Sequence, residues 1–319
     1  MTITILIGLR IIVQNISAKP VVCIIAGQIW NSNYVFNINE LPERCDILTI
    51  GQYAFDRGDI TNTFILEEDE NAIKSLKEAN KIVYLSLGFI IDYDGWSILN
   101  HLNTKEYKTK KFDPLGAIEN VSQKISDFVT PIKNKVDGLK VGIVFNASLQ
   151  VSNKTLFDFT MTNEIMDHYV IDMTNLNDCD VNSKKYGLDP ITSETMTSIE
   201  KITDIVTKST MDQSKLFALI QASVIQPDDL VEIDEKTITT YSRYCDDKVN
   251  SSRWCGNPSK LSYDQGAYVA KFYSGLYIQN LDTDDYECKC GCKKFPVTNL
   301  IIDGWTNSDF TTCPKLDKI

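Results

Sequence analysis

The stretch GLYIQNLDTDDYECKCG, at residues 275–291, begins as an apolar segment of strand length and ends in a cluster of carboxylates and cysteines. Its first residues are too apolar for a strand with one face in water, and such segments are typical of parallel sheets that are covered on both faces. Charged side chains gathered where a strand ends often mark an active site. The stretch is therefore either the rim of a catalytic pocket or the shell of one that has lost its chemistry.

Six earlier segments have the same apolar character, and amphipathic helical patterns separate them. The strand segments are 21–25, 46–50, 81–87, 139–145, 169–173 and 215–220. One helix is predicted to begin at Asp113-Pro114 and to end before Pro131, and another to be capped by Ser193. Because each strand returns through a crossover helix, the alternation requires a parallel sheet.

Seven strands without a break in composition predict one α/β domain, a TIM-type (β/α)8 barrel over 19–319 with one shortened or irregular strand. A doubly wound open sheet is the alternative, and the lack of a Gly-x-Gly-x-x-Gly motif after the first strand argues against it. Residues 222–262 are polar and poor in pattern, so we expect a small insertion there.

Charge and cysteine content narrow the class of protein. The net charge is −11 and the pI about 4.8, so nucleic acids and anionic membranes are unfavourable partners. There is no apolar run of membrane-spanning length. Nine cysteines, an odd number, predict disulfides with at least one thiol free or paired between chains. Cys288 to Cys292 (CKCGC) lacks the spacing of zinc sites, so neither a metal nor another cofactor is expected.

The N-terminus and the glycosylation motifs favour secretion. Residues 1–18 are apolar around Arg10 and predict a signal peptide that ends near Ala18, with a short strand as the alternative reading. Sequons for N-glycosylation occur at Asn15, Asn120, Asn146, Asn153 and Asn250.

Several segments resemble chitinases and chitinase-like proteins of glycoside hydrolase family eighteen. The residues from Ser262-Tyr-Asp264 through Leu281-Asp-Thr-Asp-Asp-Tyr286 to Phe295-Pro-Val297 are similar to the family's last helix and strand, and 166–174 looks like its sixth strand. The resemblance implies that residues 238–245 are the edge of a shortened α+β insertion. It also implies two disulfides, Cys23–Cys45 and Cys245–Cys290.

The family cleaves β-1,4-linked N-acetylglucosamine polymers with a fourth-strand motif, Asp-x-x-Asp-x-Asp-x-Glu, whose glutamate protonates the leaving oxygen. Two segments of this chain could correspond to that strand, and the choice stays open. Residues 89–96 keep Asp92 and Asp94 but have Trp96 at the glutamate position, whereas residues 136–144 keep Asp137 and have Val144 there. Under both alignments the general acid is missing, so the resemblance implies a protein without hydrolase activity.

The resemblance also implies a changed sugar pocket. Asn175 replaces the family's sixth-strand tyrosine, and Gln279 replaces the eighth-strand tryptophan that floors the sugar site. An amide cannot stack on a sugar ring as an indole does. The candidate binding residues at the barrel mouth are Tyr53, Phe55, Trp96, Asn175 and Gln279.

The remaining signals have structural interpretations. Asp282, Asp284 and Asp285 are expected to cap the following turn and pair with cations. His168, at the start of a strand, is expected at the surface, and at least two of the four tryptophans in the core.

These features predict a secreted glycoprotein that binds a glycan (a chitin oligosaccharide) or a protein without hydrolysing it. The alternatives are a weak or altered glycosidase on N-acetylglucosamine-containing glycans, using Asp92, Asp94 or a loop acid, and an unrelated secreted α/β binding module.

Overall fold

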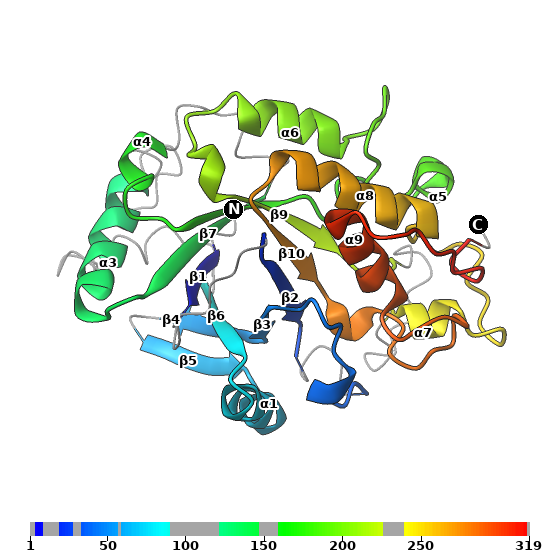
Figure 1. The fold of residues 1–319 in the computed structure, drawn as a ribbon, viewed down its shortest axis with the longest axis horizontal. Helices are drawn as coiled ribbons and strands as arrows, with labels where there is room; N and C mark the ends of the chain where they lie inside the picture. Colours follow the sequence, from blue (N-terminus) through cyan, green and yellow to red (C-terminus); the bar gives the residue numbers. More distant parts are fainter. Residues whose placement is uncertain are drawn as a thin grey trace, which may run out of the picture.

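Seven parallel strands, curled into a partial barrel with helices around the outside, form the centre of the molecule in the computed structural model (Figure 1). The structure describes residues 4–8, 19–27, 33–56, 59–89, 121–146, 159–225 and 239–317. In spatial order the parallel strands are β7 (Lys140–Asn146), β8 (His168–Asp172), β9 (Leu216–Gln221), β10 (Gly275–Gln279), β2 (Val21–Ile25), β3 (Ile47–Ile50) and β6 (Ile82–Phe89). All seven predicted strands are confirmed.

The place next to β6 is occupied by a strand of opposite direction. β1 (Thr4–Gly8) is antiparallel both to β6, with Thr4 opposite Gly88, and to β7, with Thr4 opposite Val144. In the sheet order, β1 therefore lies between the two outermost parallel strands. Apart from β4 (Gln52–Asp56), a short strand parallel to β6 that continues β3, the described part of the chain contains no eighth parallel strand of a (β/α)8 barrel. Strand β4 follows β3 along the same edge of β6 and pairs with its carboxyl end, and β5 (Asp59–Phe64) forms a hairpin with β4.

Residues alternate between two apolar regions, one on each face of the sheet. Side chains of one parity meet inside the curl, and those of the other parity pack against the helices. Burial on both faces explains why these strands read as continuous apolar segments. The interior group consists of Val22, Ile47, Tyr84, Val170, Phe217, Leu219 and Tyr277.

The described helices are α1 (Glu67–Glu78), α3 (Val121–Lys135), α4 (Phe159–Thr162), α5 (Val181–Tyr186), α6 (Ile199–Thr207), α7 (Tyr241–Tyr244), α8 (Ser259–Phe272) and α9 (Pro296–Thr306). Most of them lie around the outside of the sheet, whereas α5 and α7 lie beyond the carboxyl ends of the strands (Figure 1). Two predicted boundaries are wrong. Pro131 lies inside α3, where burial of Ile125 and Val129 offsets the lost backbone hydrogen bond. The α6 cap is Ser198, whose hydroxyl accepts from Lys201 N, whereas Ser193 Oγ accepts from Met196 N in a separate turn.

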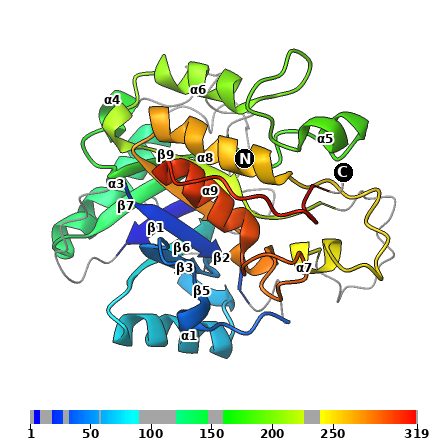
Figure 2. The same ribbon diagram turned by 45° about the vertical axis from the view of Figure 1, so that its right-hand side comes forward.

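Helices α8 and α9 lie side by side (Figure 2), and α8 also contacts β10. Their backbones approach so closely that a Cβ on Gly266 would lie 1.9 Å from the carbonyl oxygen of Ile301, and one on Gly304 1.9 Å from that of Tyr263. Glycine at both positions is therefore what lets the C-terminal helix pack beside α8.

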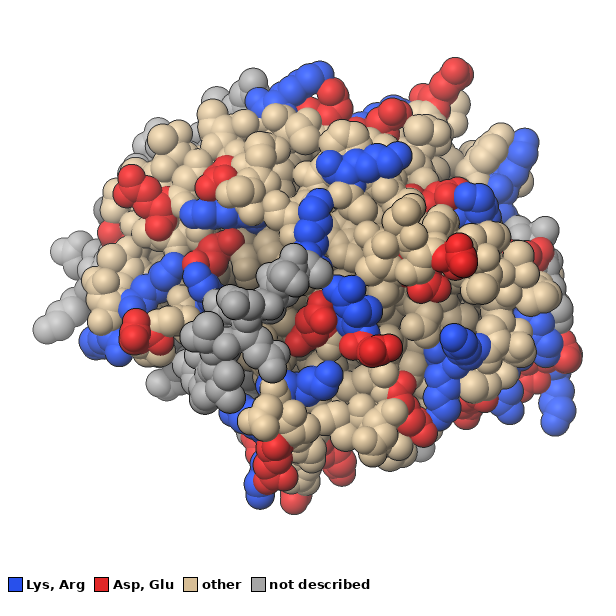
Figure 3. Space-filling view, viewed as in Figure 1, with Lys and Arg blue, Asp and Glu red and all other residues tan. Residues whose placement is uncertain are grey.

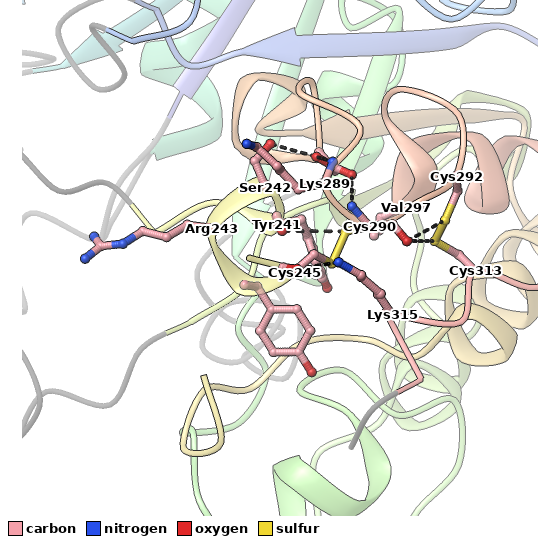
Figure 4. The surroundings of a disulfide bond; sticks show 12 residues. Tyr241, Ser242, Arg243, Cys245, Lys289, Cys290, Cys292, Val297, Cys313 and Lys315 are labelled. Carbon is pink, nitrogen blue, oxygen red and sulfur yellow. Dashed lines mark hydrogen bonds between the residues drawn. A yellow bond between two sulfur atoms is a disulfide. The ribbon is translucent and has the colours of Figure 1, made fainter. Parts of the chain in front are cut away.

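Four disulfides tie the outer segments together. Cys23–Cys45 and Cys245–Cys290, the two pairs that the resemblance implies, are present, together with Cys179–Cys255 and Cys292–Cys313. Figure 4 shows the second and fourth of these neighbouring one another, with Lys315 Nζ donating to the carbonyl of Cys245 at 3.3 Å. Cys288 is the free, exposed thiol within the described residues. None of the helices described is long and apolar enough to cross a membrane.

Candidate functional site

The carboxyl ends of β8, β9 and β10 place three polar side chains along one edge of the sheet. These are Asp172, Gln221 and Gln279, each two residues beyond an interior apolar side chain of its own strand. Strand alternation therefore directs them to the inside of the curl. Because barrel enzymes build their sites at the carboxyl ends of the strands, this mouth is the candidate site.

A fully buried carboxylate, Asp189, stands behind this edge. It accepts from Leu176 N at 2.7 Å and from Gln221 Nε2 at 3.0 Å. Burial raises the pKa of Asp189 to about 7. Such a group can hold a proton at neutral pH, as a general acid must, but with no exposed surface Asp189 cannot hand it to a substrate. In this position it fixes the loop after β8.

Asp172 is more accessible than Asp189. Burial raises the pKa of its carboxyl group too, although the backbone amide and the hydroxyl of Thr174 both donate to Asp172 Oδ1, at 3.0 and 2.7 Å. It is the carboxylate at the strand end itself.

Three buried polar atoms on the interior side of the strands have no hydrogen-bond partner in the part of the chain that the structure describes. Gln279 Oε1, Tyr277 OH and Thr49 Oγ1 make no hydrogen bond within the described residues. Gln279 thus presents an amide at the mouth, where the resemblance implies that the family has an indole ring. The interior wall there is polar.

The carboxylates of the 275–291 stretch have structural rather than catalytic roles. Asp282 accepts from the amides of Ala26 and Gly27 (2.9 and 3.2 Å), and Asp284 from Thr298 N at the start of α9 (2.8 Å). Asp285 accepts from Ser242 Oγ, Lys289 N and Cys290 N at 2.8, 2.9 and 2.6 Å. The expected capping is present, but the partners of Asp284 and Asp285 within the described chain are amides and hydroxyls rather than cationic side chains. These carboxylates stabilise the turns whose backbone amides they accept from.

Two cavities lie near the carboxyl ends of the strands. One, of about 340 Å³, is lined by the loop after β8, from Asn175 to Asn182, together with Thr195 and Met196. The other, of about 350 Å³, lies between the ends of β2 and β3 and the first turn of α1, and combines Tyr34 and Phe36 with carboxylates. The first is lined mainly by polar side chains, together with Leu176 and Met196, whereas the second has an aromatic side.

Among the described residues, the face of the molecule seen in Figure 3 has no large patch of one charge. Figure 3 shows lysine and arginine interspersed with aspartate and glutamate over the helices. Lys133–Asp167 and Lys294–Glu40 are ion pairs between segments far apart in the sequence or across a loop.

The catalytic positions considered in the sequence fall in different places. Asp92, Asp94 and Trp96 lie outside the described residues. Asp137 is exposed in the turn before β7, at the amino end of that strand, and Val144 is inside the curl on β7. The sheet order leaves one strand position between β6 and β7 and fills it with β1. Because β8, β9 and β10 then follow as sixth, seventh and eighth strands, β7 corresponds to a fifth strand.

The binding candidates are likewise dispersed. Asn175 is exposed and lines the 340 Å³ cavity, and Gln279 is at the mouth. Tyr53 and Phe55 are on β4, for which the backbone alone is described. Among the sequons, Asn250 is exposed and Asn146 ends β7, whereas Asn15, Asn120 and Asn153 lie outside the described chain.

The expectation for His168 is wrong. Its ring packs against Phe217 at 4.2 Å between centroids and near Tyr84 at 5.9 Å, inside the curl, and burial lowers the pKa of His168 to about 4. The first residue of this strand points inward, not outward. Trp254 and Trp305 are buried, as expected of at least two tryptophans.

Sequence reasoning missed Asp189 and the cavity beside it. The signal available was the cluster of amides and acids in NLNDCDVN, at 175–182, directly after a buried strand. No group of three metal-ligating side chains occurs in the described ranges.

Solved structures of known proteins have the same fold as this chain. No protein-family model and no curated protein matches this sequence. Among solved structures, catalytic domain 2 of the Group II chitinase of Ostrinia furnacalis aligns with 92% of this chain and 97% of its own, with a TM-score of 0.64 and 15% identity.

Two further structures have the same fold. YKL-39, solved in the presence of chitooligosaccharides, covers 89% of this chain and 99% of its own, with a TM-score of 0.63 and 12% identity. An immunomodulatory active chitinase from Trichuris suis covers 90% of this chain and 100% of its own, with a TM-score of 0.58 and 11% identity. At these identities, what the likeness shows is that this chain shares the β/α fold of chitinases and chitinase-like proteins.

Proposed function

We propose that this chain is a secreted chitinase-like protein that binds glycans of the chitin type without hydrolysing them. One observation carries the proposal: the strand position between β6 and β7 is held by antiparallel β1, whose sequence TILIG has no carboxylate. In the family that the sequence resembles, the fourth strand stands between the third and fifth and supplies the glutamate. A strand of reversed direction and apolar sequence supplies no general acid at the mouth.

Three of the described carboxylates near the mouth, Asp189, Asp284 and Asp285, support the same proposal. Asp189 is sealed, and Asp284 and Asp285 are engaged with backbone amides. The ligand class is supported by YKL-39, a neighbour solved in the presence of chitooligosaccharides. A polar mouth with Gln279 favours hydrogen bonding over stacking of the sugar.

Secretion belongs to the same proposal. Four disulfides are typical of proteins that fold in an oxidising compartment. The exposed Asn250 is the described acceptor best placed for glycosylation. The predicted leader, 1–18, contains β1, so a chain cleaved after Ala18 would lose that strand. The observation on β1 therefore applies to the chain that keeps residues 1–18.

A weak or altered glycosidase is the second candidate, and Asp172 is the observation that favours it. It lies at the carboxyl end of β8, and its pKa is raised by burial. A carboxyl group with a raised pKa at the mouth is what acid catalysis needs.

Chitotetraose separates the two candidates. The proposal predicts heat of binding in a calorimetric titration and no shorter oligosaccharide by mass spectrometry after prolonged incubation with stoichiometric protein. Release of chitobiose that is abolished by Asp172→Asn, Asp92→Asn or Asp94→Asn would establish the glycosidase instead. Absence of both binding and turnover would refute the glycan-binding proposal.

A further inference from the structure

The cavity of about 350 Å³ lies on the helix side of the sheet, outside the curl, and we call it the outer groove. Its base includes Ile25 and Ile50, the last residues of β2 and β3, which belong to the apolar group that faces the helices. Residues 34–36 and α1 supply most of the remaining lining. Because the polar side chains of the mouth point into the curl, a ligand in the outer groove does not occupy the mouth.

One wall of the outer groove is aromatic. It is formed by Tyr34 and Phe36, and the ring of Tyr34 packs edge-on against Tyr286 and Phe295, at 5.2 and 6.5 Å between centroids. These contacts hold the ring in place before a ligand binds, so little conformational entropy is lost on binding. Val35, between the two rings in sequence, also lines the groove and is 80% exposed.

Another wall is the acidic first turn of α1. Residues 67–70 are Glu-Glu-Asp-Glu, and the first basic residue of this helix is Lys74. Glu68 lines the groove, is exposed, and forms no ion pair with a described side chain. Asp69 also lines it and is buried, and a Cβ on Gly27 would lie 3.3 Å from both of its carboxylate oxygens.

A second buried carboxylate lies behind Gly27. Asp282 accepts from the backbone amide of Gly27 at 3.2 Å. Burial, together with the charge of Asp69, raises the pKa of Asp282 to about 6. When both carboxyl groups are ionised, the base of the outer groove therefore has a negative potential that attracts a cation and repels an anion.

The backbone beside the aromatic wall has hydrogen-bonding groups to offer. Burial alternates along it, with Tyr34 buried, Val35 exposed and Phe36 half-buried, as in an extended chain, and Asn37 has an extended φ and ψ of −134° and 110°. The N–H and C=O groups of Val35 make no backbone hydrogen bond within the described residues. An extended peptide can pair with such a segment and direct alternate side chains into a neighbouring pocket.

We propose that the outer groove docks a basic partner peptide in extended conformation, with one lysine or arginine side chain between the aromatic wall and Glu68. The aliphatic part of that side chain packs on the rings, and its cation is attracted by both the rings and the carboxylates. Charge complementarity selects this partner, because the described lining has two carboxylates and no basic side chain. The inference does not depend on glycan binding.

Fluorescence anisotropy with a labelled hexapeptide of alternating valine and lysine tests the groove. In one control peptide glutamate replaces every lysine, and in the other glycine replaces every valine. At low ionic strength the valine–lysine peptide should bind at least about fivefold more tightly than either control. Its affinity should fall as salt is added, because salt screens the attraction between exposed charges.

Two pairs of variants locate the binding. Val35→Lys is matched by Val181→Lys, at the first residue of α5, where the valine is 76% exposed. Glu68→Gln is matched by Glu78→Gln, at the exposed last residue of α1. The two groove variants should each raise Kd for the valine–lysine peptide at least about threefold, with both controls within about 1.5-fold. Each control makes the same change in net charge as its partner, so a general charge effect would appear in both.

The contrary outcomes are distinct. Equal weakening by groove variants and controls, or equal binding of the glutamate peptide, would overturn the inference. Self-association of the unmodified protein in sedimentation velocity that Val35→Lys abolishes and Val181→Lys leaves intact would assign the groove to a second copy of this chain, and would overturn it too. None of these results depends on whether chitotetraose binds, so this inference and the proposed function can fail separately.

Discussion

Replacing Asp285 by alanine should destabilise the protein strongly, because this carboxylate is structural. It is fully buried, and it accepts from Ser242 Oγ, Lys289 N and Cys290 N at 2.8, 2.9 and 2.6 Å. Alanine leaves two amides and a hydroxyl buried without an acceptor. At about 1–3 kcal/mol for each unsatisfied group, and with the hydroxyl free to rotate, the expected loss is about 3–5 kcal/mol. That is a large share of a typical stability of about 5–15 kcal/mol.

Asparagine at the same position gives a graded comparison. Asp285 Oδ1 accepts from Ser242 and Lys289, and Oδ2 from Cys290 N. Asp285→Asn can keep the Oδ1 contacts, but places an NH₂ donor opposite the amide of Cys290, so the expected loss is about 1–3 kcal/mol.

Urea unfolding at neutral pH with the disulfides intact measures these differences. Asp264→Ala is the control, since Asp264 is on the surface of α8 in an i,i+4 pair with Lys260 and should change stability by less than about 0.5 kcal/mol. If Asp285→Ala unfolds within about 1 kcal/mol of the unmodified protein, the structural reading of this acidic stretch is wrong.

Three other predictions concern stability. Burial raises the pKa of both Asp189 and Asp284 from 3.8 to about 7. Their protonated forms therefore contribute most to the free energy of unfolding at low pH, and this contribution is lost as the pH rises through 7. His168, whose pKa is lowered to about 4, adds no further change above about pH 6.5. The free energy of unfolding should therefore fall by about 1–2 kcal/mol between about pH 6.5 and 8.5 as the two aspartates lose their protons. A free energy of unfolding that rises over this range in chemical denaturation would contradict this. Gly275→Ala places a Cβ 1.9 Å from a ring carbon on β9 and should cost about 1–3 kcal/mol in urea unfolding, and no loss would argue against this packing. Tyr277→Phe removes a buried hydroxyl without a partner in the described residues, so its melting temperature should stay level or rise, and a large drop would reveal a hidden hydrogen bond.

The strands of this fold are predictable from sequence because each is buried on both faces. Segments such as 215–220 and 275–279 carry that burial in their composition, and no distant contact is needed to recognise them. The N-terminal strand is different. Five apolar residues fit a leader as well as a strand, and what distinguishes β1 is pairing with Gly88 and Val144, far along the chain.

The site was less accessible to sequence reasoning, because its parts depend on tertiary contacts. Asp189 is an acid in a polar loop, and its burial comes from Gln221 and Gln265, which approach it from β9 and α8. His168 differs for a related reason: its strand begins one residue earlier than predicted, and its inward direction follows from the register with Gly142 on β7. Such directions follow from sheet register rather than from local pattern.

The central claim, binding without hydrolysis, is tested most directly by incubating chitotetraose with an equimolar amount of the protein in ¹⁸O-labelled water. Each hydrolytic event incorporates one labelled oxygen atom from water into a shortened product, so mass spectrometry detects even a single turnover. The account predicts tetrasaccharide of full length, with no more label than a protein-free sample takes up by exchange at the reducing end, in a sample where calorimetry shows the sugar is bound. Labelled chitobiose or chitotriose would contradict it and would show that a working proton donor lies at the mouth.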